Sequence, residues 1–144
     1  MGYIEANLLP DETVVLRARL HWLIFGKATL VVALGMILLA VEPTVGTLVV
    51  LVGLVMSLPA WIAYKTSEFG VTTKRVIVKV GLVQRQTLEL LLRQVEAISV
   101  DQSIMGRMFD YGSVTLSGTG GVRGVFHNIA EPLEFRRKIQ SQTA

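Results

Sequence analysis

Two long apolar runs dominate the hydrophobic pattern of the chain. Residues 22–41 are apolar apart from Lys27 and Thr29, and residues 44–64 carry no charged side chain. Each run is about 20 residues long, and a helix of that length crosses a hydrocarbon core of about 30 Å. Only Glu42 and Pro43 separate the runs. The sequence therefore predicts two transmembrane helices, at about 22–41 and 44–64, in a tight antiparallel hairpin.

Positive charges beside the two runs predict their orientation. Lys and Arg in short flanking segments stay on the cytoplasmic side of a membrane. The loop between the runs has none, whereas the outer flanks carry Arg17, Arg19, Lys27, Lys65, Lys74 and Arg75. We expect a multi-pass protein of the cell (inner, cytoplasmic) membrane with both termini in the cytoplasm.

Small residues recur every seven positions, about two helical turns, within the predicted hairpin. A stripe of this kind lets two helix backbones approach closely and gain dispersion contacts that lipid does not supply. The alternative is that Gly and Ala are simply frequent in such helices. The predicted packing residues are Gly26, Ala33 and Ala40 in the first helix and Gly46, Gly53 and Ala60 in the second.

After the second run the pattern changes to short alternating segments separated by turn residues, which is typical of β-strands. Val76 and Val78 alternate with Ile77, so one face of that strand is expected in the core and the other partly in water. The predicted elements are strands at 67–72, 75–80, 82–91, 95–100, 113–117 and about 122–127, a helical turn at 103–109 and an amphipathic helix at 131–140.

Residues 14–20, before the first run, also alternate, which predicts a strand that pairs with residues 67–72. An amphipathic helix on the membrane surface is the alternative. The expected fold is an α+β membrane protein: an N-terminal segment at 1–21, the hairpin at 22–64, and at 65–144 a small β-barrel or sandwich capped by a C-terminal helix.

The segment Glu68-Phe69-Gly70-Val71-Thr72, followed by residues 74–78 and 81–82, resembles the opening of the bacterial pleckstrin-homology (PH)-like domain of the membrane-flanked type. Further similarity lies at 95–96, 103–107, 111–112, 118–121 and 132–136, and in Arg19-Leu20-His21-Trp22 before the first helix. The resemblance covers nearly the whole chain and implies the PH-like fold, with paired membrane helices before the domain. It implies no catalytic residues.

Composition narrows the possible functions. The chain has 51% hydrophobic and 17% charged residues, which is too apolar for an ordinary soluble domain of this size. It has no Cys and only two His, and its net charge of +3 is too diffuse for a nucleic-acid surface. We expect no enzyme activity, no catalytic residues, no cofactor, no metal site and no nucleic-acid partner.

Two motifs could bind anions. The Gly-rich segment at 118–124 lacks the Lys-Ser/Thr of a phosphate-binding loop, so a hairpin turn is the better interpretation. Lys74 and Arg75 resemble the basic first hairpin of eukaryotic phosphoinositide-binding PH domains, but a strand of about 3.3 Å per residue carries them away from the membrane. The possible lipid headgroup contacts are therefore Arg17, Arg19, Lys65, Lys79 and Arg85, with an ordinary solvated strand face as the alternative.

The leading hypothesis is a non-enzymatic, membrane-anchored interaction or scaffold module. Its PH-like domain would bind a protein partner, or a second copy in a homo-oligomer, beside the membrane lipids. The alternative is a module that senses anionic lipids or another ligand. An accessory subunit of a membrane transport complex is a weaker alternative, because Lys27 is the only charge within the spans and lies near one end.

Overall fold

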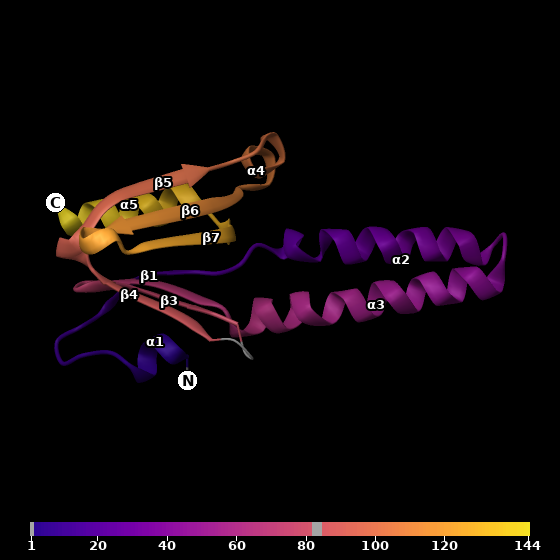
Figure 1. The fold of residues 1–144 in the computed structure, drawn as a ribbon, viewed down its shortest axis with the longest axis horizontal. Coiled ribbons are helices and arrows are strands. Elements are labelled where there is room, and N and C mark those ends of the chain that lie inside the picture. Colours follow the sequence, from indigo (N-terminus) through magenta and orange to yellow (C-terminus); the bar gives the residue numbers. More distant parts are fainter. Residues whose placement is uncertain (1, 82–84) are drawn as a thin grey trace. The chain divides into compact units, whose positions relative to one another are not determined.

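Two compact units make up the chain, and one of them is discontinuous in sequence. In the computed structural model, which describes residues 2–81 and 85–144, the first unit comprises Met1–His21 together with Thr66–Ala144. The second comprises Trp22–Lys65. We call them the β-domain and the helix pair (Figure 1). Residues 1–21 thus belong to the same unit as the residues after the helices.

The first sheet of the β-domain is antiparallel, with the order β1-β2-β3-β4. Its strands are β1 (Val14–Ala18), β2 (Glu68–Thr72), β3 (Arg75–Val80) and β4 (Gln86–Leu91). β1 pairs with β2, which confirms the strand predicted at 14–20 and its pairing with residues 67–72 over the alternative of a surface helix. The strand predicted at 82–91 begins at Gln86, and residues 82–84 lie outside the described part of the chain.

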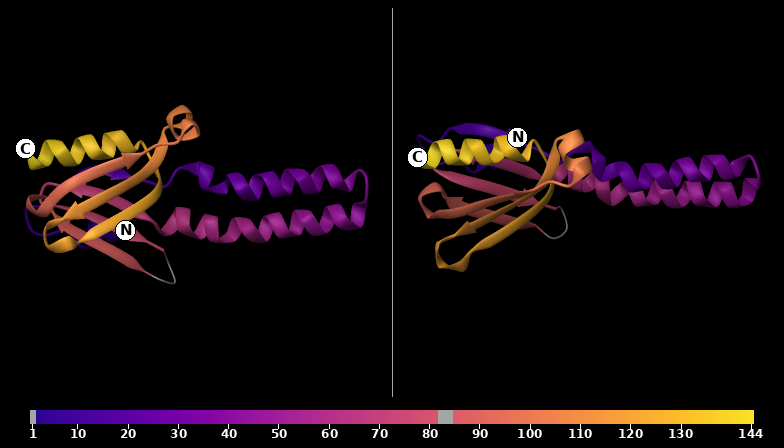
Figure 2. Two further views of the ribbon diagram at one scale, coloured as in Figure 1. Left: turned by 45° about the horizontal axis from the view of Figure 1, so that its top comes forward. Right: turned by 90° about the horizontal axis from the view of Figure 1, so that it is seen from above.

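The second sheet has the antiparallel order β5-β6-β7. Its strands are β5 (Val95–Asp101), β6 (Tyr111–Gly118) and β7 (Arg123–Ala130), joined by the helix α4 (Ile104–Phe109) and the short turn η3 (Thr119–Gly121), and preceded by η2 (Leu92–Gln94). The last helix, α5 (Pro132–Thr143), begins at a proline and packs against β5 and β6 (Figure 2).

The core of the β-domain lies between the two sheets and beneath α5. Phe69 of β2 meets Phe126 of β7 edge to face, with ring centroids 5.9 Å apart, so the sheets face each other. Other fully buried side chains come from both sheets and from α5: Val76, Val78, Leu116, Ile129, Phe135 and Ile139. The resulting architecture is a small β-sandwich covered by its C-terminal helix.

The expectation that one face of β3 is partly wet is wrong for Ile77, which is 0% exposed. A short N-terminal helix, α1 (Tyr3–Ala6), covers this face of the sheet. Gly70 lies opposite Ile77 in the register, and a Cβ at Gly70 would be only 2.6 Å from Cδ1 of Ile4. The missing side chain at Gly70 therefore makes room for Ile4, which is itself buried.

The helix pair consists of the turn η1 (Trp22–Phe25), α2 (Gly26–Leu39) and α3 (Pro43–Thr66). The run predicted as one helix at 22–41 thus starts with a 3-10 turn. Both spans are long and apolar enough to cross a membrane by length and composition, and only 11% of the most apolar window of each is buried. The rings of Phe25 and Tyr64 lie 5.7 Å apart.

Glycines mark the contact between α2 and α3. A Cβ at Gly53 would lie 2.6 Å from Cγ2 of Val32, and one at Gly46 would collide with the backbone of Leu39. Gly35 is buried against Val50, although the predicted stripe does not contain it. Of the remaining predicted residues, Ala60 is half-buried, Gly26 is near only Leu23 of its own helix, and Ala33 and Ala40 are exposed. A seven-residue spacing fits more than one face of α2, so the spacing alone does not distinguish the face of Ala33 from that of Gly35.

Candidate functional site

The sheet register gives the β-domain two distinct ends. Ala18 lies opposite Phe69, and Glu68 lies opposite Lys79. These residues share the end at which the chain passes to the helix pair, which we call the junction end. The turn between β2 and β3, at Thr73 and Lys74, lies at the opposite end, which we call the far end.

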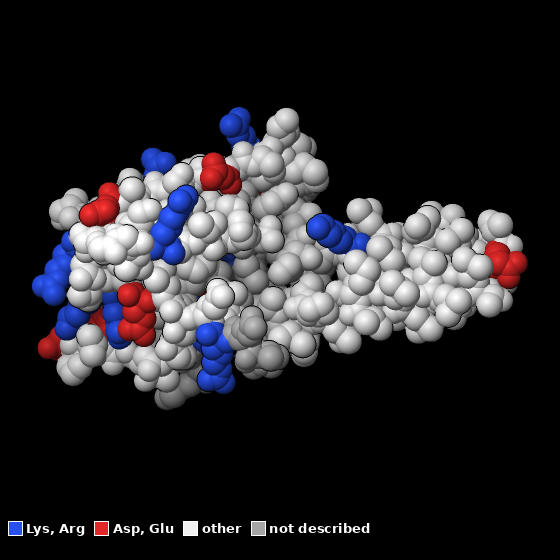
Figure 3. Space-filling view, viewed as in Figure 1, with Lys and Arg blue, Asp and Glu red and all other residues white. Residues whose placement is uncertain are grey.

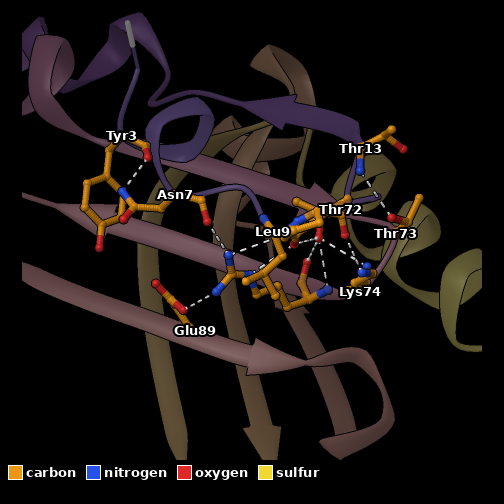
Figure 4. A network of polar contacts seen from close by, with 11 residues as sticks. Tyr3, Asn7, Leu9, Thr13, Thr72, Thr73, Lys74 and Glu89 are labelled. Carbon is orange, nitrogen blue, oxygen red and sulfur yellow. Dashed lines mark hydrogen bonds and ion pairs between the residues drawn. The ribbon is translucent and has the colours of Figure 1, made fainter.

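Arg75 forms the centre of a buried polar network at the far end. Figure 4 shows this network and labels Asn7, Thr72 and Glu89 among its members. The side chain of Arg75 is 11% exposed, and that of Glu12 is 0% exposed. Nε and Nη2 of Arg75 donate to the two carboxylate oxygens of Glu12 over 3.0 and 3.1 Å, and Nη1 donates to Glu89 over 2.5 Å. Nη2 also donates to the carbonyl of Asn7. One guanidinium thus joins the N-terminal segment to β3 and β4.

The Glu12 carboxylate has two further hydrogen-bond donors. Thr72 Oγ1 donates to it over 2.6 Å, and the backbone amide of Leu9 over 2.7 Å. Burial alone would raise the pKa of Glu12, but the hydrogen bonds from Arg75, Thr72 and Leu9 outweigh it and hold the pKa below its usual value. The hydrogen bond to Glu12 likewise raises the pKa of Arg75. The pair is therefore ionised in the folded protein at neutral pH.

Lys74, the other cation of this hairpin, is also held by the N-terminal segment. Its Nζ donates to the carbonyl of Pro10 over 2.8 Å. Thr72 Oγ1 shapes the turn by accepting hydrogen bonds from the amides of Lys74 and Arg75 over 3.2 and 3.0 Å. Lys74 and Arg75 of the basic hairpin thus both contact the N-terminal segment.

A cavity of about 560 Å³ opens beside this network at the far end. Leu91, Leu92 and Val95 contribute apolar surface to it, and Lys74 and the exposed Arg93 contribute positive charge. Gln142, near the C-terminal end of α5, also lines it. We call this the far-end pocket. Its combination of an apolar lining with two cations suits a segment that carries both apolar and acidic side chains.

Two of the predicted lipid contacts touch α1. Arg17 forms an ion pair with Glu5, which lowers the pKa of that carboxyl, and Nζ of Lys79 lies 5.3 Å from the centre of the Tyr3 ring. The amides of Tyr3 and Ile4 donate to Glu68, so α1 is tied onto this face of the sheet. The other members of the predicted set, Arg19 and Arg85 in the β-domain and Lys65 in α3, are exposed.

At the junction end the two sheets are joined just before the first apolar helix. Leu20 forms an isolated β-bridge with Ile129, and the amide of His21 donates to the carbonyl of Asn128 over 2.8 Å. The imidazole of the buried His21 stacks on Tyr111 with ring centroids 5.2 Å apart. His21 therefore has a packing role at this junction.

The remaining motifs have simple structural roles. Gly120 and Gly121 take positive φ angles of 80° and 79° in the exposed turn between β6 and β7, a conformation that favours glycine. His127 is exposed, with its Nδ1 2.9 Å from Ser113 Oγ. Within residues 2–81 and 85–144 no group of three or more His, Cys, Asp or Glu side chains could hold a metal ion.

Glu12, Arg75 and the far-end pocket are the features that sequence reasoning missed. The only available signal was the charged Arg75 at the edge of an apolar strand, since Glu12 is 63 positions away.

In a comparison with protein families, the family described as Bacterial PH domain matches residues 15–143. A comparison with curated proteins finds no match.

Proposed function

The chain belongs to the bacterial PH domain family, and we propose that it is a non-enzymatic interaction module anchored in the cytoplasmic membrane. In this proposal α2 and α3 cross the bilayer as a hairpin, and the β-domain lies on the cytoplasmic side. Its far-end pocket binds an acidic segment of a partner protein. Family membership supports an interaction module in general, and the anchoring and the partner rest on the arguments below.

Exposed apolar side chains on the helix pair are the observation that carries the anchoring. Large side chains such as Leu30, Ile37 and Val55 point outward, and on the face seen in Figure 3 no charge lies between the two ends of the pair. The core helix of a soluble protein would bury most of such a window, and a continuous apolar surface of this length is unfavourable in water. In lipid the same surface needs no further partner.

Fusions to a reporter that is active only outside the cytoplasm test this anchoring and its orientation. Lys27 and Lys65 flank the spans on the side of the β-domain, so the reporter should be inactive after residue 144. It should be active when inserted between Glu42 and Pro43. Activity after residue 144, or none at the loop, would contradict the proposed topology.

The partner-binding part of the proposal rests on the far-end pocket. Because the sheet register puts this pocket at the end opposite the junction, a membrane-anchored β-domain would keep it accessible from the cytoplasm. Lys74 and Arg93 favour a segment with negative charge, and the apolar lining adds burial of its hydrophobic side chains. Charges at an interface of this kind mainly set the association rate and the choice of partner.

Pull-down of the full-length protein from mild detergent, followed by cross-linking, tests the pocket. Arg93→Glu reverses one of its charges and should slow association and lower the amount of partner captured. Arg137→Glu, an equal charge change at an exposed position of α5, is the matched control and should leave capture intact. If Arg93→Glu captures the same proteins in the same amounts as the unmodified chain, the pocket is not the binding site.

A further inference from the structure

The short helix α4 holds three large apolar side chains away from the core. They lie at i, i+1 and i+4, so they form two adjacent rows on one face of the helix. Elsewhere in the β-domain most large apolar residues are buried or half-buried, although Leu9, Val122, Val125 and Leu133 are 41–47% exposed. The exposed fractions on α4 are higher, at 80% for Ile104, 53% for Met105 and 74% for Met108.

This exposure does not come from a loosely held loop. Ser103 caps the first turn by accepting a hydrogen bond from the amide of Gly106 over 3.0 Å. Asp110 ends the helix with φ of 57°, and its amide donates to the carbonyl of Gly106. Gly106 is buried, and a Cβ there would lie 2.6 Å from the carbonyl oxygen of Tyr111. The backbone is fixed on its inner side, so the apolar face is held outward by the fold.

The place of α4 in the β-domain is fixed by the strand that follows it. Tyr111, which begins the strand directly after α4, stacks on His21, and Trp22 next in the chain opens the first apolar span. The helix therefore belongs to the junction end of the β-domain. If the spans cross a bilayer, this end lies at the membrane surface, where water gives way to headgroups and acyl chains.

The side chains of α4 match the chemistry of that boundary. The helix carries no acidic residue, and its single cation, Arg107, is exposed. An apolar face combined with a cation is typical of helices that lie at the lipid surface, because the cation can reach the anionic headgroups while the apolar side chains enter the acyl region.

We propose that α4 is a membrane-contacting wedge whose side chains, led by Ile104 and Met108, insert into the interfacial region of the bilayer. This inference rests on the proposed anchoring by α2 and α3, and it adds a third contact with lipid that fixes the orientation of the β-domain. The occupant of the α4 face is the lipid surface, not a second copy of the chain.

A single label tests the proposal, because the chain contains no Cys. Met108→Cys in the full-length protein is labelled with a polarity-sensitive fluorophore and reconstituted into nanodiscs of zwitterionic and anionic phospholipid. The matched positions are Ser141→Cys, exposed on α5, and Val52→Cys, exposed on α3. Each label is challenged with aqueous iodide and with lipids that carry a nitroxide near the top of the acyl chain; because residue 52 lies near the middle of α3, its label is also challenged with lipids that carry the nitroxide near the end of the acyl chain.

With α4 in the interface, the label at 108 shows blue-shifted emission, loss of iodide quenching and strong quenching by the nitroxide lipid, whereas the label at 141 shows the reverse. Iodide quenching at 108 equal to that at 141 would overturn the inference. Protection at 108 without nitroxide quenching would also overturn it, because protein would then cover α4. The label at 52 separates the two proposals: if nitroxide lipid does not quench it, the anchoring itself fails.

Discussion

The β-domain and the helix pair use the same apolar residues in opposite ways. In the β-domain Val76 and Ile77 are 0% exposed, whereas in the helix pair Val55 is 64% and Ile37 67% exposed. Apart from α4 and a few surface positions, the β-domain buries or half-buries its large apolar side chains, and its buried Arg75 and Glu12 pair with each other. The helix pair presents its apolar atoms outward. The contrast indicates that the two units are adapted to different solvents, water for one and lipid for the other under the proposed anchoring.

The two units are therefore packed by different forces. In the β-domain, burial of apolar surface favours packing at roughly 25 cal/mol per Å². Between two helices in lipid that force is absent, and close packing has to supply the attraction. Glycines serve both units, because Gly70 admits the side chain of Ile4 and Gly53 admits Val32 of the facing helix. Removal of a buried charge should therefore lower the stability of the β-domain most, and a larger residue at the helix contact should lower the stability of the helix pair.

The largest effect is expected at Arg75. Arg75→Ala leaves the carboxylate of Glu12 buried without its cation, which typically costs about 3–5 kcal/mol. Hydrogen exchange of β3 amides in the full-length protein in detergent should show that loss in the free energy of opening, with α2 amides unaffected. Arg123→Ala, at an exposed position of β7, is the control and should change little. A loss no larger than that of the control would mean that the network does not stabilise the β-domain.

The next largest effect is expected at Gly53, within the other unit. Gly53→Leu places atoms where a Cβ alone would already be 2.6 Å from Val32 Cγ2 and 2.9 Å from its backbone nitrogen. Overpacking of this kind costs about 1–3 kcal/mol. Thermal unfolding of the helix pair in detergent should register it, while protection of β3 amides stays unchanged. Val52→Leu, at an exposed position of the same helix, is the control, and equal effects would show that this contact does not hold the helices together.

Acid should weaken the β-domain through Glu12. The pKa of Glu12 is below its usual value in the folded state, so its contribution to stability is present above the usual pKa and is lost as the pH falls through the folded pKa. The difference in stability between the unmodified chain and Glu12→Gln should therefore be largest at neutral pH and shrink below about pH 4. Hydrogen exchange of β3 amides at several pH values checks this. A difference independent of pH would mean that Glu12 does not act through its charge.

Local pattern predicted much of the sandwich but not the interactions that close it. The strand at 75–80 was predicted with its observed boundaries, because alternation and turn residues are local signals. The helix α1 is only four residues long and has no periodicity to detect. Its cover over Ile77 and the pairing of Glu12 with Arg75 depend on the tertiary fold, since the partners are far apart in sequence. A charge at a strand edge predicts a wet position unless its distant partner is known.

The same limit applies to the helix pair and to α4. The spacing of small residues predicted Gly46 and Gly53 as helix-packing positions. It could not distinguish the face of Ala33 from that of Gly35, because both belong to a pattern of small residues in α2. For residues 103–109 the sequence predicted a helical turn, which is present as α4. Whether its apolar side chains point inward or outward depends on which side of the turn the buried Gly106 occupies.

The smallest effect is expected for Arg17, which differs from Arg75 mainly in its surroundings. Both arginines pair with a glutamate, but the side chain of Arg17 is 46% exposed and its partner Glu5 is 42% exposed. Water and salt screen such a pair, and two long side chains lose conformational freedom in forming it. Arg17→Ala should therefore shift β3 amide exchange no more than the Arg123→Ala control does. If Arg17→Ala instead destabilised the β-domain as strongly as Arg75→Ala, burial would not be what separates the two ion pairs. The conclusion that buried ion pairs stabilise the β-domain more than exposed ones would then be wrong.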